Sequence, residues 1–499
     1  MNTDIQNFFQ NKIIFVTGGT GFLGKVLIEK ILRSTKVRRI YVIVRPKSGH
    51  ESIVERFNDI LKSPLFEKLH KLRPKFPDHI QLMEGDCSQE NLGLSNDDYR
   101  TLIENVEVIM HCAATVRFNE TLSLATQINV HGTADIIKMA KEMKHLKSFV
   151  HISTAFVNCT TIHCVEGFTK DKLNVTCEQL LNIKKSLSPE QFDSLTPTLI
   201  GKYPNTYSFT KAVSEEFVQT HAESLPICIL RPAIVFSTSE EPFAGWMDNI
   251  QGAAGVTYGI LMGALRVVNT AFERRAPIVP VDYCANIMLA AAWYTASLDT
   301  SKFTKNPTIY NFTPEESNLM TWGRYINIFL NSNCQMPYSK IMWYPMVKII
   351  SNNFLYRLML FLYQTIPAYI MDVICKLQGS KMSVVKLNQK ISRLTDSLRY
   401  FLAYDFTFDT ANTRHLWKSM SSEDKKLFNF DMMSLQWNVY LQNNAKGLRR
   451  FAAKEEPSTI PAARSSLKRF KICHLAINSI VFMALLWIVK NVFFVFWKW

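Results

Sequence analysis

Apolar positions recur along the first half of the chain with two different periods. Short runs rich in β-branched residues, such as IIFVT at 13–17, have the length and composition of buried strands. Segments such as KVLIEKILRS at 25–34 place apolar residues three or four apart, as an amphipathic helix does. We expect further strands at 40–44, 80–86, 106–114 and 148–154, and helices at 124–144 and 206–223. This alternation predicts an α/β fold with a parallel sheet.

A glycine-rich turn joins the first strand to the first of these helices. Gly18, Gly21 and Gly24 stand at G-x-x-G-x-x-G spacing. Glycine permits a tight turn, a close approach of the backbone to a pyrophosphate, and close packing of helix on strand. The free N–H groups of the helix start favour an anion. The predicted dinucleotide contacts here are Thr17, Gly18, Gly19, Thr20, Gly21, Phe22, Leu23 and Gly24.

The second strand ends in basic residues. An NAD enzyme usually has an acidic residue near this position for the ribose 2′-hydroxyl, whereas this chain has Arg45 and then Lys47. Arginine accommodates a 2′-phosphate, so we predict NADP(H) rather than NAD. The alternative is a solvated basic pair.

Candidate ligand residues share one position in the predicted sheet. Gly18, Arg45, Asp86, Ala113 and the pair Ser153/Thr154 all follow the ends of strands. Ligands of doubly wound parallel sheets bind outside the carboxyl ends of the strands. The pattern therefore predicts a Rossmann-type nucleotide site at this edge.

Tyr207 and Lys211 lie four residues apart in the predicted helix, so they face the same way. Such a pair can simply share a helix face. Beside a nicotinamide, however, a phenol, an ammonium and a Ser/Thr hydroxyl make a hydride-transfer site. A nearby Lys would lower the pKa of the phenol, and the hydroxyl would stabilise an oxyanion.

Composition bounds the class of protein. With 499 residues, 47% hydrophobic and 20% charged, the chain is long enough for two or three globular domains. A formal net charge of +15 suggests an anionic partner: nucleic acid, a phosphate-rich cofactor or a membrane surface. The basic stretches lack the patterns of nucleic-acid binders, so we expect no nucleic acid. The ten cysteines show no zinc-ligand spacing, so we expect reduced thiols, a cytosol-facing protein and no metal.

The end of the chain contains a candidate membrane anchor. Residues 472–489 carry no formal charge over 18 positions, which at about 1.5 Å per residue is near the thickness of a hydrocarbon core. The positive-inside rule places the N-terminal part in the cytosol. A buried or interfacial helix is the alternative, favoured by His474, Asn478 and Lys490. The basic residues before the segment are Arg464, Lys468, Arg469 and Lys471.

A second apolar segment, 341–377, has several interpretations. It could form a membrane-embedded hairpin, a monotopic face, an acyl-chain tunnel or a buried helical pair. We expect burial with partial membrane contact rather than a true span. The following stretch, 381–394, reads as an amphipathic helix with a basic face, suited to solvent or to a membrane surface.

Several strings together resemble one family. They include VTGGTGFLGKVLIEKILR, HCAATVRFNE, HISTAFVN, YSFTKAVSE, EPFAGWMDNIQG and IVPVDYCAN, in order over residues 11–290. The chain resembles the eukaryotic fatty acyl-CoA reductases, the insect-type members most closely, which are extended short-chain dehydrogenase/reductases. The ending of the family's C-terminal helical region, named after male sterility, is similar to residues 428–455.

The resemblance implies roles for individual residues. Tyr207 would donate the proton, Lys211 would bind the ribose hydroxyls, and Thr154, with Ser153 as the alternative, would hydrogen-bond the carbonyl oxygen. Arg45 would contact the 2′-phosphate. One departure is Phe156, where the family usually has tyrosine. Adenine and ribose contacts would fall on Asp86, Cys87, Ala113 and Ala114.

The resemblance also implies an organisation and a reaction. We expect a reductase domain at 11–290 with a substrate portion to about 330, a helical sterile-type domain at 340–456, a basic linker at 457–471 and a transmembrane anchor at 472–489. The implied reaction is NADPH-dependent reduction of long-chain acyl-CoA to a primary alcohol through an aldehyde, releasing CoA. The implied partners are acyl-CoA and membrane lipid, with a homo-oligomer as one option. The expected membrane is the endoplasmic reticulum, with peroxisome or lipid droplet as alternatives. Other hypotheses are a membrane-bound 3β-hydroxysteroid dehydrogenase and an inactive NADP-binding scaffold.

Overall fold

The chain folds into two compact units, each assembled from three separate stretches. The computed structural model describes residues 2–47, 49, 51–168, 173–250, 252–298, 306–379 and 383–496. Unit 1 comprises Met1–Met247, Arg275–Met320 and Tyr404–Tyr440. Unit 2 comprises Asp248–Arg274, Thr321–Ala403 and Leu441–Trp499.

Unit 1 is built around a parallel sheet. Among the described residues seven strands pair in the order β11-β7-β5-β4-β1-β2-β3, all parallel. This order confirms the doubly wound Rossmann-type sheet predicted from the alternation of strands and helices. The strands are β1 (Ile13–Thr17), β2 (Arg39–Val44), β3 (Ile80–Glu84), β4 (Val108–His111), β5 (Ser148–Ile152), β7 (Ile227–Pro232) and β11 (Thr308–Phe312).

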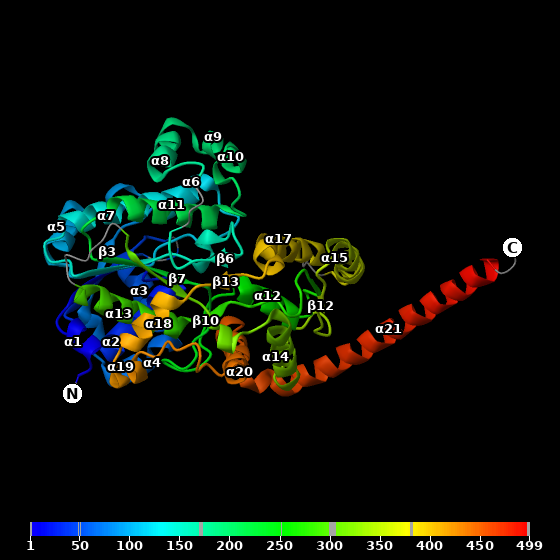
Figure 1. Ribbon diagram of the computed structural model, residues 1–499. Coiled ribbons are helices and arrows are strands. Elements are labelled where there is room, and N and C mark those ends of the chain that lie inside the picture. The colour runs from blue at the N-terminus through cyan, green and yellow to red at the C-terminus, as the bar shows by residue number, and fades with distance from the viewer. Residues whose placement is uncertain are drawn as a thin grey trace. The chain divides into compact units, whose positions relative to one another are not determined.

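Helices cover both faces of this sheet (Figure 1). On one side lie α2 (Phe22–Ser34) and α13 (Val281–Ser297), and on the other α5 (Asn96–Asn105), α7 (Gly132–Glu142) and α11 (Thr206–His221). The predicted helix 124–144 is continuous, but it contains a π-helical turn, η4 (Thr126–His131), between α6 (Leu122–Ala125) and α7. The other helices of unit 1 are α1 (Asp4–Phe9), α3 (Ile53–Leu61), α4 (Glu67–Leu72), α8 (Cys177–Ser186), α9 (Pro189–Ser194), α10 (Thr196–Ile200), α18 (Ala411–Ser419) and α19 (Ser422–Leu427).

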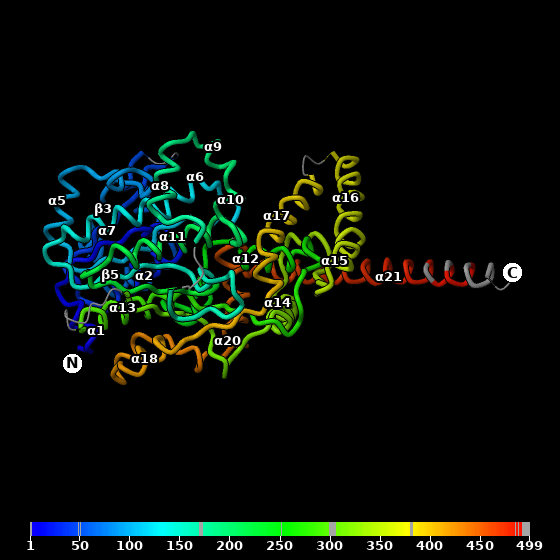
Figure 2. Tube along the Cα trace, turned by 45° about the horizontal axis from the view of Figure 1, so that its top comes forward, coloured from blue at the N-terminus to red at the C-terminus, as the bar shows by residue number. Residues whose placement is uncertain are grey.

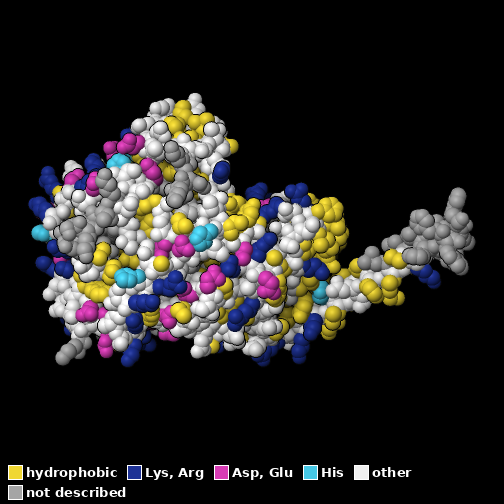
Figure 3. Space-filling view, in the orientation of Figure 1, with side chains coloured by type: hydrophobic (Ala, Val, Ile, Leu, Met, Phe, Trp, Pro, Cys, Tyr) yellow, Lys and Arg dark blue, Asp and Glu magenta, His cyan; other side chains and the backbone are white. Residues whose placement is uncertain are grey.

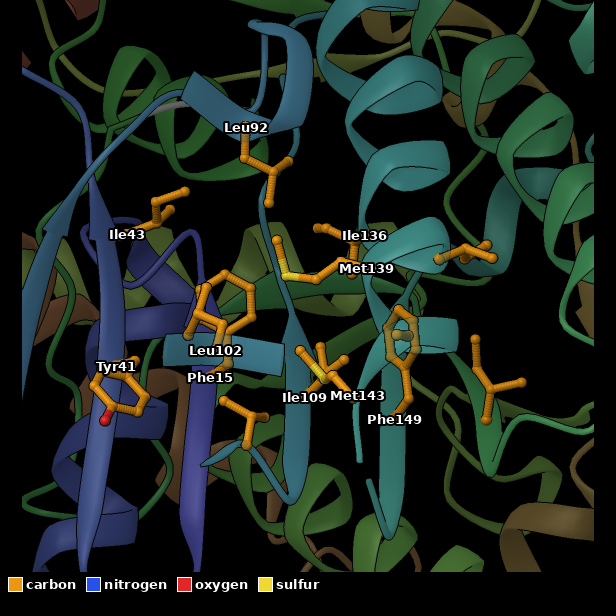
Figure 4. Packing of buried hydrophobic residues seen from close by; sticks show 14 of the residues in the cluster. Phe15, Tyr41, Ile43, Leu92, Leu102, Ile109, Ile136, Met139, Met143 and Phe149 are labelled. Carbon is orange, nitrogen blue, oxygen red and sulfur yellow. The ribbon is translucent and has the colours of Figure 1, made fainter. Parts of the chain in front are cut away.

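A hydrophobic cluster joins the sheet to the helices of one face (Figure 4). Phe15 of β1, Ile109 of β4 and Phe149 of β5 meet Leu102 of α5 and Met139 of α7. All five side chains are fully buried. Because side chains alternate across a strand, Ile13 and Phe15 of β1 lie in this cluster, whereas Ile14 and Val16 are buried on the other face of the sheet.

The segment 404–440 belongs to unit 1, although we expected it inside a separate C-terminal helical domain at 340–456. Its backbone is bound by residues from earlier in the chain. Asn286 Nδ2 donates to the Asn429 carbonyl at 2.7 Å. The short strand β13 (Thr407–Phe408) pairs with β6 (His163–Cys164). These long-range hydrogen bonds are invisible in a linear sequence.

Unit 2 is mainly helical. Figure 2 shows α15, α16 and α17 as neighbours within it. Its only described strands, β9 (Val267–Val268) and β12 (Lys348–Ile349), pair in parallel. Its helices are α12 (Gly252–Leu261), α14 (Trp322–Gln335), α15 (Asn353–Leu360), η8 (Phe361–Thr365), α16 (Ile366–Leu377), α17 (Val384–Ala403), the part of α20 (Trp437–Gly447) after Tyr440, and α21 (Ile460–Phe496).

Most of the stretch 457–471, which we expected to be a basic linker, is helical. A short 3₁₀ turn at Pro457–Thr459 leads directly into α21, which runs from Ile460 through the predicted anchor. Proline at the start of a helix is favourable because its missing N–H has no helical partner there. Two described helical segments are long and apolar enough to cross a membrane: Asn353–Leu377 and Pro457–Asn491.

A buried ion pair ties α11 to the sheet. Arg231 of β7 donates through Nε to Glu215 of α11 at 2.9 Å, and its Nη2 also binds this carboxylate. Its Nη1 donates to the carbonyls of Val165 and Gly167 at 3.1 and 3.0 Å. Both charged side chains are at most 3% exposed.

We therefore expect Arg231→Met to lower the free energy of unfolding by about 3–5 kcal/mol, because it leaves the Glu215 charge buried without its partner. Thermal unfolding in detergent measures the change. Lys62→Met, which removes an exposed ion pair, is the control and should shift the midpoint little. Equal midpoints for the Arg231 variant and the parent protein would contradict this assignment.

Candidate active site

The glycine turn lies in close contact with two neighbouring elements. Gly18 has φ +70°, and a Cβ built on it would lie 2.7 Å from the backbone N of Ala113, just beyond β4. A Cβ on Gly24 would lie 2.2 Å from the carbonyl O of Gly18. Both positions therefore require glycine, one for the close approach of β4 and the other for packing α2 against its own turn.

Thr17 connects β1 to β4 through its hydroxyl. Thr17 Oγ1 accepts from the Ala113 N–H at 3.2 Å and lies 2.7 Å from His111 Nδ1. His111 Nε2 lies 3.1 Å from Thr133 Oγ1, so both ring nitrogens have partners. Burial, and secondarily Lys211, lowers the pKa of His111 to about 3, so this imidazole is neutral. The predicted contact residues Thr17, Ala113 and Ala114 thus sit at one edge, with Thr17 serving the scaffold.

A cationic corner lies beside the turn. Arg56 of α3 donates through Nη2 to Thr20 Oγ1 at 3.3 Å, and its Nη1 binds the carbonyl oxygen of Arg45. The pKa of Arg56 is lowered by burial and by the charge of Arg45. Two guanidiniums that destabilise each other at the edge of a nucleotide site are suited to an anionic group between them.

Arg56 was missed by the sequence reasoning. It lies in the middle of an exposed helix, eleven residues beyond Arg45, where a basic residue usually serves solubility. No spacing rule indicates that α3 returns to the glycine turn.

Asp86 and Cys87 follow β3 as predicted, but they face different surroundings. Asp86 Oδ1 accepts from the Ser88 N–H at 2.9 Å, and Asp86 Oδ2 lies 3.6 Å from Arg45 Nη1. Cys87 belongs to the hydrophobic core, and burial raises the pKa of its thiol to about 12. Cys87 could therefore contact a cofactor only through its backbone.

Tyr207, Lys211 and Thr154 come together at the end of β5. Asn205 caps α11 by accepting from the Ser208 N–H at 2.9 Å, which places Tyr207 in the first turn of the helix. The Thr154 side chain lies close enough to the Tyr207 phenol to oppose the rise in its pKa. Lys211 Nζ donates to the Ile152 carbonyl at 2.7 Å. The three groups predicted to carry the chemistry are thus neighbours.

Ser153 and Thr154 differ in their hydrogen bonds. Thr154 Oγ1 accepts from the Phe156 N–H at 3.3 Å besides contacting Tyr207. The Ser153 hydroxyl is buried, and its Oγ has no hydrogen-bond partner within the described part of the chain. Thr154 is the better candidate for the catalytic hydroxyl. The free hydroxyl of Ser153 fits a site that receives a further polar group.

Burial dominates the protonation of this site. It raises the pKa of Tyr207 to about 12, with a smaller opposing effect from Thr154. It lowers the pKa of Lys211 to about 8, opposed by Glu215. Burial thus raises the pKa of Tyr207, whereas we predicted that Lys211 would lower it.

Asn129, on the π-helical turn η4, was also missed. Its Nδ2 donates to Thr210 Oγ1 at 3.0 Å and to the Thr115 carbonyl at 3.2 Å, while its Oδ1 accepts from the Thr115 N–H at 2.9 Å. It therefore holds α11 against the turn that follows β4. In the sequence, the only indication was an amide at a position of the predicted helix that faces the core. Such an indication is weak without the structure.

Asp282 shapes the loop that follows β8 (Ile234–Phe236). Its carboxylate accepts from the N–H groups of Ser239, Glu240 and Glu241 at 2.8, 2.9 and 2.9 Å. Burial raises the pKa of this carboxyl to about 6, with the three N–H groups opposing the shift. Further along the loop, Trp246 stacks on Phe22 of the glycine turn, with ring centroids 5.6 Å apart. The predicted turn residue Phe22 thus meets a loop far away in sequence.

The fold and this edge define a class of protein. A doubly wound parallel sheet with a glycine turn after β1 is the reductase-domain form of the Rossmann-like dinucleotide-binding fold. Family models described as male sterility protein match residues 16–288, an NAD(P)-binding domain, and residues 363–455.

Curated relatives match along nearly the whole chain. Fatty acyl-CoA reductase wat of Drosophila melanogaster is 41% identical over 97% of this chain and 92% of its own length. Fatty acyl-CoA reductase 1 of Rattus norvegicus is 36% identical over 97% and 92%, and fatty acyl-CoA reductase 2 of Homo sapiens is 35% identical over 96% and 92%. The chain belongs to the fatty acyl-CoA reductase family, whose members are oxidoreductases.

Solved structures support the fold alone. The terminal reductase domain of the myxalamid biosynthetic pathway has a TM-score of 0.57 at 19% identity, covering 90% of this chain and 93% of that one. The reductase domain of a nonribosomal peptide synthetase from Mycobacterium tuberculosis has a TM-score of 0.56 at 19% identity, covering 88% and 92%.

The glycine turn generates a direct test. We expect Gly24→Ala to abolish measurable dinucleotide binding, because the added methyl would meet the Gly18 carbonyl at 2.2 Å and push α2 off the turn. Isothermal titration with NADPH measures the loss. Gly167→Ala, whose Cβ would find its nearest neighbour at 4.0 Å, should bind normally. Unchanged affinity in the Gly24 variant would show that the turn does not carry the cofactor.

Proposed function

We propose that this protein reduces long-chain acyl-CoA to a primary alcohol through an aldehyde, with release of CoA. The similarity to fatty acyl-CoA reductases over nearly the whole chain supports acyl-CoA as the substrate class. The observation that carries the chemistry is the placement of Tyr207 beside Thr154 at the end of β5, with Lys211 Nζ donating to the Ile152 carbonyl at 2.7 Å.

The cofactor in this proposal is NADPH, which supplies the hydride for each of the two reductions. The glycine turn Gly18–Gly24 would hold its pyrophosphate against the N-terminus of α2. Asp86 would accept from the adenosine part. Arg45 and Arg56 would hold the 2′-phosphate, since Arg56 binds Thr20 of the turn and the Arg45 carbonyl, and the charge of Arg45 lowers the pKa of Arg56.

The chain's own groups would handle the protons and the oxyanion. Tyr207 would donate a proton to the oxygen of the reduced carbonyl, first of the thioester and then, after taking up a proton from solvent, of the aldehyde. Thr154 would hydrogen-bond the same oxygen and orient the phenol. Between the two reductions the hemithioacetal breaks its C–S bond, and CoA leaves as a thiol with the proton of the hemithioacetal hydroxyl.

Lys211 would support Tyr207 electrostatically once the site is filled. In the protein alone, burial keeps the pKa of Tyr207 near 12 and that of Lys211 near 8. An anionic cofactor near Lys211 favours its charged form, and a charged Lys211 in turn favours the phenolate. Catalytic tuning would therefore be completed by the cofactor.

The proposed location is a membrane, with α21 as the anchor and the N-terminal part in the cytosol. The segment Pro457–Asn491 has sufficient length and apolar composition, and basic residues precede its apolar stretch. The endoplasmic reticulum is the proposed membrane. A membrane location suits an enzyme whose substrate has a long acyl chain.

A product assay tests the reaction. Detergent-solubilised protein with NADPH and long-chain acyl-CoA should form fatty alcohol and free CoA, detected by mass spectrometry and a thiol assay. Tyr207→Phe should lower this rate by roughly 10²–10⁴-fold because it removes the proton donor, and it should bind NADPH nearly normally. No alcohol or aldehyde from a protein shown to bind NADPH would refute the proposal, and normal turnover of the variant would refute the role of Tyr207.

The 2′-phosphate site has its own test. We expect Arg56→Leu and Arg45→Leu each to weaken NADPH binding by about 10-fold or more, because a hydrogen bond to a charged group contributes about 1.5–3 kcal/mol. NADH binding should change little. Lys62→Met, at the exposed end of α3, is the matched control. Equal losses for NADPH and NADH would remove the arginines from the phosphate site.

A further inference from the structure

Unit 2 exposes a continuous apolar face along α15, η8 and α16. The exposed large apolar side chains recur every three or four residues over 354–377, so they share one side of the helix pair. Phe354 is 79% exposed and Leu377 83%. Figure 3 shows hydrophobic side chains gathered over these helices. The members of this face are Phe354, Leu355, Leu358, Phe361, Leu362, Ile366, Tyr369, Ile370, Val373, Ile374 and Leu377.

The opposite side of the same helices is polar and committed to protein contacts. Gln364 Nε2 donates to Asn388 Oδ1 of α17 at 2.9 Å, and its Oε1 accepts from the Arg266 N–H at 3.2 Å. Asp372 accepts from the Val385 N–H at 3.3 Å. A lone transmembrane helix would expose such groups to hydrocarbon, which is costly. The segment is therefore suited to lie on a membrane with one face, although its length would permit a span.

The exposed charges of these helices and of the neighbouring α17 are mostly positive. Within 353–379 and 383–403 the exposed charged side chains are five basic residues and one acidic residue, Asp396. Basic side chains beside an apolar face match the anionic lipids of a cytosolic leaflet. A second protein copy would need a complementary acidic rim, which this face does not offer to itself. The five basic residues are Arg357, Lys376, Lys386, Lys390 and Arg393.

The face is physically connected to the base of α21. Trp343 Nε1 donates to His474 Nδ1 of α21 at 3.3 Å, and Tyr344 stacks on the His474 ring at 5.5 Å. Arg266 lies over the Trp343 ring at 5.5 Å and donates through Nη1 to the Tyr363 carbonyl of η8 at 3.2 Å. Arg266 thus contacts both Trp343, which binds His474 of α21, and Tyr363 of η8.

We propose that the outer face of α15, η8 and α16 binds the lipid surface as a second, monotopic membrane contact beside α21. The inference rests on the proposed anchoring by α21. A helix that enters the bilayer near His474 brings the membrane surface to the residues fixed around it. The apolar face then sinks into the headgroup boundary while Gln364 and Asp372 stay in protein.

Site-specific photocrosslinking in the full chain tests this inference. The protein is reconstituted in phosphatidylcholine vesicles containing phosphatidylserine, with benzoylphenylalanine placed singly at Ile370, Phe482 or Leu72. Ile370 reports on the apolar face, Phe482 on α21, and Leu72, an exposed apolar residue of α4 in unit 1, is the control. Mass spectrometry identifies lipid adducts.

We expect lipid adducts at Ile370 and Phe482 and few at Leu72. Adducts at Phe482 alone would overturn the second contact while leaving the anchor in place. Adducts at neither position would overturn both, and crosslinks of Ile370 to a second copy of the chain would assign the face to a protein interface.

Charge reversal provides a second readout that does not touch the apolar face. Lys386→Glu with Lys390→Glu should lower the Ile370 adduct yield several-fold on vesicles with phosphatidylserine, and Phe482 should be unaffected. Both lysines are exposed, so the fold should tolerate the change. An unchanged Ile370 yield would show that anionic lipid does not hold this face.

Discussion

The approach of the glycine turn to the end of β4 is the constraint on which the site depends. Gly18 and Ala113 are so close that no side chain fits between them, and the Thr17 hydroxyl bonds the same Ala113 N–H. Because β4 lies between β1 and β5 in the sheet, this contact also sets the distance from the turn to Ser153 and Thr154. Asn129 is hydrogen-bonded both to Thr115, in the turn after β4, and to Thr210 of α11, so it holds α11 against that turn. The glycine turn, the end of β4 and the start of α11 are thus held together at one edge of the sheet.

The reacting groups sit in surroundings that oppose charge. Burial raises the pKa of Tyr207 and lowers those of Lys211 and His111, so burial disfavours the charged form of each group. A neutral phenol is the form that can donate a proton. This environment is consistent with a proton donor whose pKa changes when a charged dinucleotide binds. The predicted effect of Lys211 on the pKa of Tyr207 would act against this burial.

Unit 2 distributes its apolar residues differently from unit 1. In unit 1 the apolar residues of the strands fill a closed core. In unit 2 a long apolar face on α15 and α16 remains open, and α21 carries an exposed apolar surface of its own. Large open faces of this kind mark contact surfaces. The two segments that are long and apolar enough to cross a membrane, Asn353–Leu377 and Pro457–Asn491, both lie in unit 2. Any membrane attachment through them therefore involves this unit.

The sequence by itself determined the parallel sheet and placed Gly18, Arg45, Asp86 and Thr154 after the ends of its strands. It could do so because strand and helix periods are local, and because parallel strands bring their ends to one edge. Tertiary structure alone decided that Arg56 returns to Thr20, that Asp282 holds the loop at 239–241, that Cys87 points into the core, and that residues 404–440 belong to unit 1. It also turned the predicted linker at 457–471 into helix. These outcomes depend on contacts between residues far apart in the chain, for which local periodicity carries no signal.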